Sequence, residues 1–405
     1  MRNEISDASG RMAGIPRRSL LRGAMAAGIT AASGSLVHGA TRQETTERIR
    51  QQMGATPRKK WRGVNLGSWL VLEKWITPKV FQGAADAADE FSLCEKLGPK
   101  AAQTQLRAHQ DSFITEDDFK WIAARGINVV RIPVGYWTLT APKPFVSGAE
   151  TLDRAFAQAA KHGLGVLLDL HGAPGSQNGW DHSGKSGELG WHKSKDNIAL
   201  TLDSIEQLSE RYAKRSNLVG IELLNEPRWD VPVDILKEYY TQGYRRVRRH
   251  IKNADVAVVI HDGFRPMDWE NFLTGPDYTN VILDTHMYQC YTDEDRKRDG
   301  AAQIAFASGN RRSQIDAMKK QQPQIIVGEW STALDPKSYG AASPFERDTI
   351  KRGYGAAQVT SYEASSGWFY WTYKMEKPSD WSFRENVDRG WLPPTFAEPT
   401  QKASI

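Results

Sequence analysis

The sequence predicts a single-domain α/β fold, the (β/α)₈ TIM barrel, on three observations. From Trp61 onward, short β-branched runs alternate with longer stretches of helical pattern, which is typical of a parallel sheet. The runs are almost continuously apolar, as expected of strands that are buried on both faces. There are eight such runs, and eight parallel strands joined by crossover helices close into a barrel.

The eight predicted strands follow one another in order, and each interval between them is long enough for a helix. They span residues 62–66, 128–134, 165–171, 219–226, 256–261, 281–288, 324–329 and 367–371. On this basis, residues 61–395 form the barrel domain and residues 396–405 form a tail.

The amino-terminal forty residues resemble an export signal. The pair Arg17–Arg18 precedes two leucines and a weakly apolar, Ala/Gly-rich stretch over 23–37, as in a twin-arginine signal. A basic tail without a targeting role is the alternative. Residues 41–60 are polar and are interpreted as a linker or lead-in helix. Apolar runs of roughly 18 residues, the length of a membrane span, do not occur, so no stable membrane insertion is expected.

Charge and cysteine content exclude several classes of function. Residues 1–40 hold five arginines against two acidic residues, which leaves +2 of the net charge of +5 for the rest of the chain. So small a net charge gives no basis for predicting nucleic-acid binding. The basic run over 245–249 has helical spacing and is expected on a solvent-exposed helix face. Cys94 and Cys290 have no metal-ligand spacing and are expected to be free and buried, although one disulfide is arithmetically possible.

Polar side chains stand at the carboxyl end of every predicted strand. They are Asn65, Arg131, His171, Asn225 with Glu226, His261, His286 with Tyr288, Glu329 and Trp371. In a barrel of this type the carboxyl ends of the strands form the catalytic face. The chain also has 14 tryptophans and 13 tyrosines, which suit a sugar-binding cleft as well as a core.

Two glutamates, Glu226 and Glu329, follow buried apolar strands and can face one another across the barrel mouth. A pair of carboxyl groups is what glycoside cleavage requires, at about 5–5.5 Å for retention and roughly 6.5–9.5 Å for inversion. One carboxyl must be protonated and the other ionised, and mutual repulsion in unequal surroundings separates their pKa values. Arg131 is expected to keep the nucleophile ionised, and Asn225 is expected to bind the sugar 2-hydroxyl.

The same residues resemble glycoside hydrolase family 5, and within it the fungal-type exo-β-1,3-glucanases. The resemblance runs from Arg62 to about Pro393. It is carried, in order, by RGVNLGSWLVLEKWITP (62–78), DEFSLCEKLG (89–98), ITEDDFKWI (114–122), VVRIPVGYW (129–137), DLHGAPGSQNGWDHSG (169–184), GIELLNEP (220–227), VVIHDGF (258–264), GEWSTAL (328–334) and GWFYWTYKMEKPSDWSF (367–383).

The resemblance implies a retaining mechanism, with Glu226 as acid/base and Glu329 as nucleophile. It implies that glucose would be released from the non-reducing ends of β-1,3-glucan, without a cofactor or a metal, by an enzyme that is expected to be monomeric. The substrate-binding residues that it implies are Glu73, Arg131, His171, Asn178, Trp180, Asp181, Asn225, His286, Tyr288, Tyr291 and Trp371. Among these, Glu73 and Asp181 match positions that hold the terminal glucose and close the pocket.

The sequence departs from the family pattern at the pocket mouth. Trp180 and Tyr291 replace a pair of phenylalanines, and Met287 replaces a histidine that is usual in the run before Tyr288. An endo-acting β-glucanase, or another family 5 specificity such as β-1,6-glucan or a glucosylated lipid, is therefore the alternative. A glycan-binding barrel without activity would require the loss of a catalytic group, and both glutamates are intact. A metal-dependent hydrolase would require a histidine pair on the first strand, where Asn65 stands.

Overall fold

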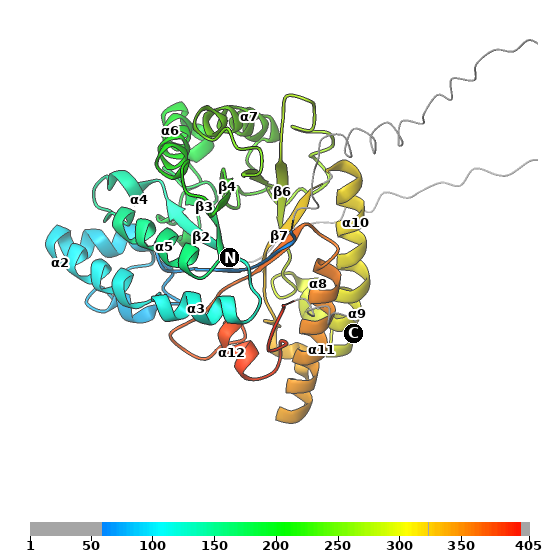
Figure 1. Ribbon diagram of the computed structural model, residues 1–405. Coiled ribbons are helices and arrows are strands. Elements are labelled where there is room, and N and C mark those ends of the chain that lie inside the picture. Colours follow the sequence, from blue (N-terminus) through cyan, green and yellow to red (C-terminus); the bar gives the residue numbers. More distant parts are fainter. Residues whose placement is uncertain (1–58, 323, 398–405) are drawn as a thin grey trace, which may run out of the picture. The chain divides into compact units, whose positions relative to one another are not determined.

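The computed structural model describes residues 59–322 and 324–397. Their strands form a closed, all-parallel barrel in sequence order, with the last strand paired to the first, which confirms the predicted fold (Figure 1). The strands are β1 (Trp61–Asn65), β2 (Val129–Gly135), β3 (Gly165–Gly172), β4 (Leu218–Glu222), β5 (Ala257–His261), β6 (Val281–His286), β7 (Ile325–Trp330) and β8 (Gly367–Tyr370). The predicted export signal and most of the lead-in lie outside the described residues.

Helices follow the strands and surround the barrel (Figure 1). The longer ones are α2 (Glu90–Ser112), α3 (Glu116–Ala124), α5 (Ala149–Lys161), α6 (Lys195–Tyr212), α7 (Val233–His250), α10 (Arg312–Gln321) and α11 (Pro344–Tyr362). Short helices and single turns are α4 (Trp137–Thr140), α8 (Asp293–Lys297), α9 (Gly300–Phe306), α12 (Phe383–Asp388), η1 (Pro78–Phe81), η2 (Asp181–Ser183), η3 (Trp191–Lys193), η4 (Ala307–Arg311) and η5 (Pro336–Tyr339).

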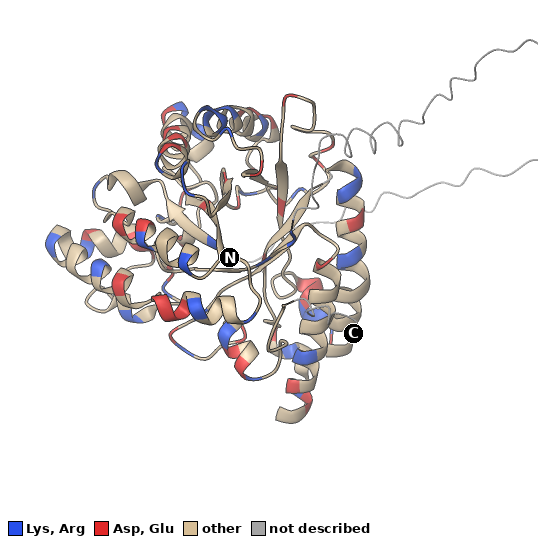
Figure 2. Ribbon diagram, viewed as in Figure 1, with Lys and Arg blue, Asp and Glu red and all other residues tan. Residues whose placement is uncertain are grey.

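The helix boundaries have local causes. Asp89 and Ser343 form capping boxes at the first turns of α2 and α11, so the first free backbone N–H groups are bonded there. Helix α2 contains Gly98 at φ 72° followed by Pro99, which ends one helical segment and begins the next. The basic run lies on α7, which buries apolar side chains on its other face, and charged residues lie along the outer helices (Figure 2).

Two strands end two or more residues before their predicted ends. The fourth ends at Glu222 and not at Glu226, because the chain leaves the regular ladder there, although the Asn225 amide still donates to the Leu170 carbonyl. The sixth ends at His286, two residues before Tyr288. These extra residues therefore belong to the loops at the barrel mouth, where side chains are free to turn inward.

Inward-pointing side chains recur every second residue along each strand and form layers inside the barrel. At the amino ends of the strands an apolar layer contains Val129, Leu167, Val259, Ile282, Ile326 and Phe369. Gly63 belongs to this layer, because a Cβ atom there would lie 2.1 Å from the Phe369 ring. Two residues further along four of these strands the inward-facing residues are polar, namely Arg131, Asp169, His261 and Asp284. This polar layer is the floor of the candidate site.

Three further predictions can be compared with the structure. Cys94 is free and buried, whereas Cys290 is free but only half-buried, because it lies in the loop that follows β6. Within residues 59–322 and 324–397, no helix combines the length and the apolar character that crossing a membrane requires. Phe396, placed in the predicted tail, is buried against Trp368, so packing extends one residue past the predicted domain end.

Candidate active site

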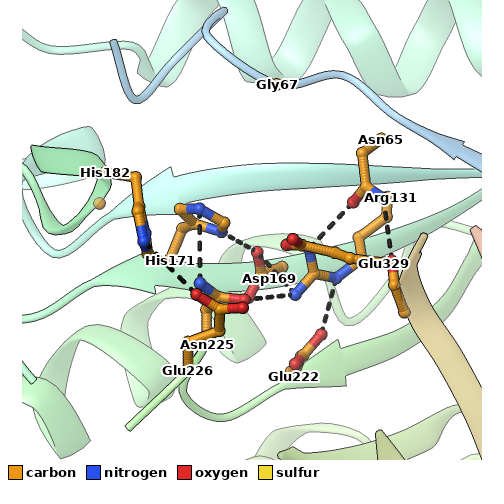
Figure 3. A network of polar contacts seen from close by, with 12 residues as sticks. Asn65, Gly67, Arg131, Asp169, His171, His182, Glu222, Asn225, Glu226 and Glu329 are labelled. Carbon is orange, nitrogen blue, oxygen red and sulfur yellow. Dashed lines mark hydrogen bonds and ion pairs between the residues drawn. The ribbon is translucent and has the colours of Figure 1, made fainter. Parts of the chain in front are cut away.

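The Arg131 guanidinium lies at the centre of a polar network on the barrel floor (Figure 3). It contacts Glu222 Oε2 at 2.8 Å, Asn65 Oδ1 and Asn225 Oδ1 at 2.9 Å, Glu329 Oε1 at 3.0 Å and Asp169 Oδ2 at 3.2 Å. The side chain is fully buried, so these partners replace the water that a cation would otherwise hold. Arg131 therefore fixes several strand ends at once.

Glu329 lies near the end of β7 and is held on both oxygens. Arg131 donates to Oε1 at 3.0 Å, and the Tyr288 hydroxyl donates to Oε2 at 2.8 Å. Burial raises the pKa of Glu329 to about 7, with the nearby Glu226 charge adding to this, while His286, Arg131 and Tyr288 oppose the shift. The arginine contact predicted from sequence is present, but burial outweighs it.

Glu226 follows β4 with φ 43°, a left-handed conformation that is rare for residues other than glycine. Such strain often accompanies functional sites. His286 Nδ1 lies 2.6 Å from its Oε1, and His182 Nε2 lies 3.4 Å from its Oε2. Burial would raise the pKa of Glu226, but the hydrogen bond and charge of His286 outweigh it and hold that pKa well below the usual value.

His286 connects the two glutamates. Its Nδ1 is 2.6 Å from Glu226 Oε1 and 3.4 Å from Glu329 Oε2, so these two carboxylate oxygens lie no more than 6.0 Å apart, the sum of the two distances. Burial alone would lower the pKa of His286, but the charges of Glu329 and Asp284 raise it well above the usual value. The imidazolium therefore neutralises much of the charge of the pair.

His171 and Trp371 form one wall of the site. Their rings stack in parallel at 5.4 Å and 4°. His171 Nδ1 lies 2.6 Å from Asp169, and its Nε2 accepts from the Asn225 amide at 3.4 Å. Burial lowers the pKa of His171 to about 4, so the ring is neutral and its hydrogen-bonding direction is set by these partners. The stacked indole offers an apolar face to a sugar ring.

Glu73 and Asp181 supply two further carboxylates. Glu73 is buried, and Trp75 Nε1 donates to its Oε2 at 2.9 Å. Burial, and next the charge of Asp181, raise the pKa of Glu73 well above its usual value. Its Oε1 accepts no hydrogen bond within the described part of the chain. A buried acceptor without a partner is costly unless a ligand satisfies it.

Asn178, another predicted substrate-binding residue, forms its side-chain hydrogen bonds to the backbone. It is fully buried, its amide nitrogen donates to the Glu226 carbonyl at 3.2 Å, and its Oδ1 accepts from the Trp180 amide at 2.9 Å. The structure thus ties Asn178 to the backbone of Glu226 and to that of Trp180. Asn225 and Arg131 are likewise fully buried, and they lie beneath the groups that face the mouth.

Comparison with known proteins identifies the family. Residues 94–377 match the family model for cellulase (glycosyl hydrolase family 5). A glucan 1,3-beta-glucosidase from Blumeria graminis is 39% identical over 378 residues, covering 82% of this chain and 87% of the relative. A probable glucan 1,3-beta-glucosidase A from Emericella nidulans is 38% identical and covers 84% and 91%. The chain belongs to glycosyl hydrolase family 5. The predicted family is confirmed.

Solved structures support the fold of this family 5 chain. The rutinosidase from Aspergillus niger superposes with a TM-score of 0.71 at 23% identity, covering 83% of this chain and 98% of that one. An endoglucanase from Thermotoga maritima superposes at 0.53 and 16% identity, covering 81% and 93%. At such identities the likeness shows the barrel alone.

Sequence reasoning missed the layer beneath the predicted residues. Asp169, Glu222 and Asp284 are fully buried carboxylates with no place in the predicted site. Asp169 and Asp284 stand two residues before His171 and His286 on the same strands, and the two-residue period of a strand puts each pair on one face. That spacing could have found these two, whereas Glu222 is the last residue of β4 and the chain has left the strand before Glu226. His182, Trp229 and Phe264 were also missed, because they lie on loops without such a period.

Glu226, His261 and His286 each offer a possible metal-ligand atom within 4.8 Å of the others. In this arrangement His286 Nδ1 and Glu226 Oε1 share a 2.6 Å hydrogen bond, and His261 Nδ1 accepts from the Gly263 amide at 2.9 Å. These contacts use the groups as proton donors and acceptors.

Proposed function

We propose that this family 5 enzyme is a retaining β-glucoside hydrolase, namely an exo-β-1,3-glucanase that releases glucose from non-reducing ends. The observation that carries the mechanism is the His286 bridge, which limits the nearest Glu226 and Glu329 oxygens to 6.0 Å, the sum of 2.6 and 3.4 Å. Retaining enzymes hold their carboxyl groups about 5–5.5 Å apart, whereas inverting enzymes leave room for a water molecule between them.

In the first step a Glu329 oxygen attacks the anomeric carbon. The bond from that carbon to the leaving oxygen breaks, and the leaving oxygen takes a proton from Glu226. In the second step water attacks the same carbon and returns a proton to Glu226, which releases glucose and frees Glu329. Arg131 and Tyr288 orient Glu329 for the attack by holding its two oxygens, at 3.0 and 2.8 Å.

His286 stores the proton that Glu226 must deliver. Its raised pKa keeps the proton on the histidine before the reaction, and the 2.6 Å hydrogen bond is the path for its transfer to Glu226. The same transfer removes two charges that act on Glu329 in opposite directions: the His286 charge, which lowers its pKa more strongly, and the Glu226 charge, which raises it. Arg131 and the Tyr288 hydroxyl then hold Glu329 in the ionised form that attacks.

Exo action is supported by the two extra carboxylates. The free Oε1 of Glu73 can accept from a hydroxyl of a terminal glucose, and Asp181 lies close enough for its charge to raise the pKa of Glu73. A buried Glu73 beside a half-buried Asp181 at one end of the site leaves little room for a further sugar. The relatives named glucan 1,3-beta-glucosidase support β-1,3 linkage for this chain.

We also propose that residues 1–40 direct export and that the enzyme acts as a monomer outside the cytoplasm. The Arg17–Arg18 pair before an Ala/Gly-rich stretch supports the first part. Replacing both arginines with lysine is expected to leave the full-length chain inside the cell. Export of the Lys–Lys variant at the parental level would refute a twin-arginine route.

The deciding experiment follows products from laminarin over time, with β-1,4- and β-1,6-linked glucans alongside. Glucose alone at early times, from laminarin, is expected. Proton NMR should show the β anomer first, since retention preserves configuration. Mixed oligosaccharides would favour the endo-acting alternative, a different linkage would favour another family 5 specificity, and the α anomer first would refute retention.

A further inference from the structure

Aromatic side chains at the barrel mouth fall into two groups on opposite sides. The first, called here the acid-side cluster, consists of Trp180, Trp229 and Phe264 from the loops after β3, β4 and β5. Its ring centroids lie 5.9–6.1 Å apart in all three pairings. The second, the nucleophile-side cluster, consists of Trp75, Tyr288, Tyr291 and Trp381 from the loops after β1, β6 and β8, with neighbouring rings at 5.3–6.2 Å.

Each cluster is connected to one of the two glutamates. On one side His182 Nε2 lies 3.4 Å from Glu226, and the His182 ring lies 5.5 Å from Trp180. On the other side the Tyr288 hydroxyl donates to Glu329. The general acid protonates the leaving oxygen and therefore lies on the leaving-group side of the bond. The acid-side cluster thus extends outward along the path of the leaving sugar chain.

Trp229 is the outer member of the acid-side cluster. Its side chain is 55% exposed, which is unusual for an indole, and exposed apolar area of this kind commonly marks a binding surface. The loop that carries it is fixed, because Arg228 bonds Asp230 at 2.7 and 2.6 Å and donates to the Asn178 carbonyl at 3.2 Å. The indole is therefore held out toward solvent by a rigid support, at little cost in ordering when a ligand binds.

We propose that Trp229 forms a binding position for the second sugar of the leaving-group chain, outward from Trp180. This inference rests on the function proposed above, and its occupant is a glucosyl unit whose C–H face packs on the indole. The enzyme would consequently prefer oligosaccharides of three or more sugars over the disaccharide. Trp180 serves the sugar next to the scissile bond, so the two indoles are separable in experiment.

The test compares kcat/KM for laminaribiose and laminaritriose. The disaccharide places one sugar beyond the scissile bond, and the trisaccharide places two. Trp229→Ala is expected to lower the triose-to-biose ratio by about tenfold, a loss typical of one aromatic contact, with biose changed less than about twofold. Trp229→Phe should restore part of the ratio. Trp180→Ala should lower both values.

Phe345→Ala is the matched control, since Phe345 is an aromatic residue of α11 that is 76% exposed, and it should leave the ratio unchanged. An unchanged ratio in Trp229→Ala, or an equal loss on both sugars with an unaltered melting temperature, would overturn the inference. If the parent does not cleave β-1,3 oligosaccharides, the proposed linkage fails. The same ratio is then measured on the β-1,4- or β-1,6-linked oligosaccharides that the enzyme cleaves. An unchanged ratio in Trp229→Ala on those sugars would refute the binding position independently of the linkage.

Discussion

At the scale of single residues, the candidate site is a set of charges that neutralise one another. Arg131 offsets Asp169, Glu222 and Glu329 on the floor, and His286 bridges Glu226 and Glu329 above it. Burial makes each of these charges costly alone. Removing one member is therefore expected to alter the protonation of its neighbours as well as its own contact.

The first residue-scale prediction distinguishes the two glutamates. Glu226→Ala and Glu329→Ala should each lower turnover of laminaribiose by at least about a hundredfold. With an activated aryl β-glucoside, azide should rescue both. Glu226→Ala should yield the β-glucosyl azide, because azide attacks the glycosyl-enzyme, and Glu329→Ala the α-glucosyl azide, because azide replaces the nucleophile. NMR of the products identifies the anomer formed by each variant. If the two anomers were reversed, Glu226 would be the nucleophile and Glu329 the acid/base.

The second residue-scale prediction concerns pH. Glu329 must be ionised to attack, so kcat/KM is expected to fall as the pH falls through its pKa of about 7. The Tyr288 hydroxyl bond lowers that pKa, so Tyr288→Phe should move the acid limb to higher pH by up to about one unit. Tyr278→Phe, in the segment before β6 at the other end of the barrel, is the control. An acid limb that stays in place or moves down would contradict the assignment.

At the scale of elements, the loops after the strands carry the chemistry, and the helices hold the loops. Glu90, the first residue of α2, accepts from the Leu72 amide at 3.0 Å and from Trp137 Nε1 at 2.9 Å, which ties the helix to the loops after β1 and β2. Burial raises the pKa of Glu90 to about 8. The helix start is thus fastened to the loop that carries Glu73.

The element-scale prediction tests the break within α2. Gly98 has φ 72° and ψ 164°, and a Cβ atom there would meet nothing within 4 Å, so only backbone strain opposes a side chain. Gly98→Ala should lower the free energy of unfolding by about 1–3 kcal/mol. Gly309→Ala, which is also uncrowded but lies in a helical turn without positive φ, should be neutral or stabilising. Urea unfolding measures both, and equal effects would contradict the argument.

At the scale of the whole barrel, closure depends on joining the first strand to the last. Glu363 accepts from Arg62 Nε at 2.8 Å and Nη2 at 3.1 Å, and from Trp368 Nε1 at 2.9 Å, so it links β1 and β8 from outside. Burial would raise the pKa of Glu363, but Arg62, Trp368 and Lys60 lower it to about 2. The ionised carboxylate therefore stabilises the closed barrel.

The whole-molecule prediction follows from that shift. Because the folded pKa lies below the ordinary value of 4.5, the contribution of Glu363 is present above about pH 4.5 and is lost as the pH falls toward 2. Glu363→Gln should lower the melting temperature by a few degrees at pH 7. The difference from the parent should shrink between pH 4.5 and 3. A difference that is constant over this range would show that charge plays no part.

The sequence by itself determined the barrel, the family and most of the residues that face its mouth. Strand periodicity is a pattern among neighbouring residues, so a short stretch of sequence is enough to recognise it. Residues near strand ends, such as Glu329, can be predicted from it. Only the tertiary structure decided that Glu226 leaves the strand, that His286 bridges the glutamates, and that the aromatic residues divide into two sides. Those contacts join residues such as Glu226 and His286, 60 positions apart, and depend on strand register and loop path. Neither the strand register nor the loop path can be predicted from a local sequence pattern.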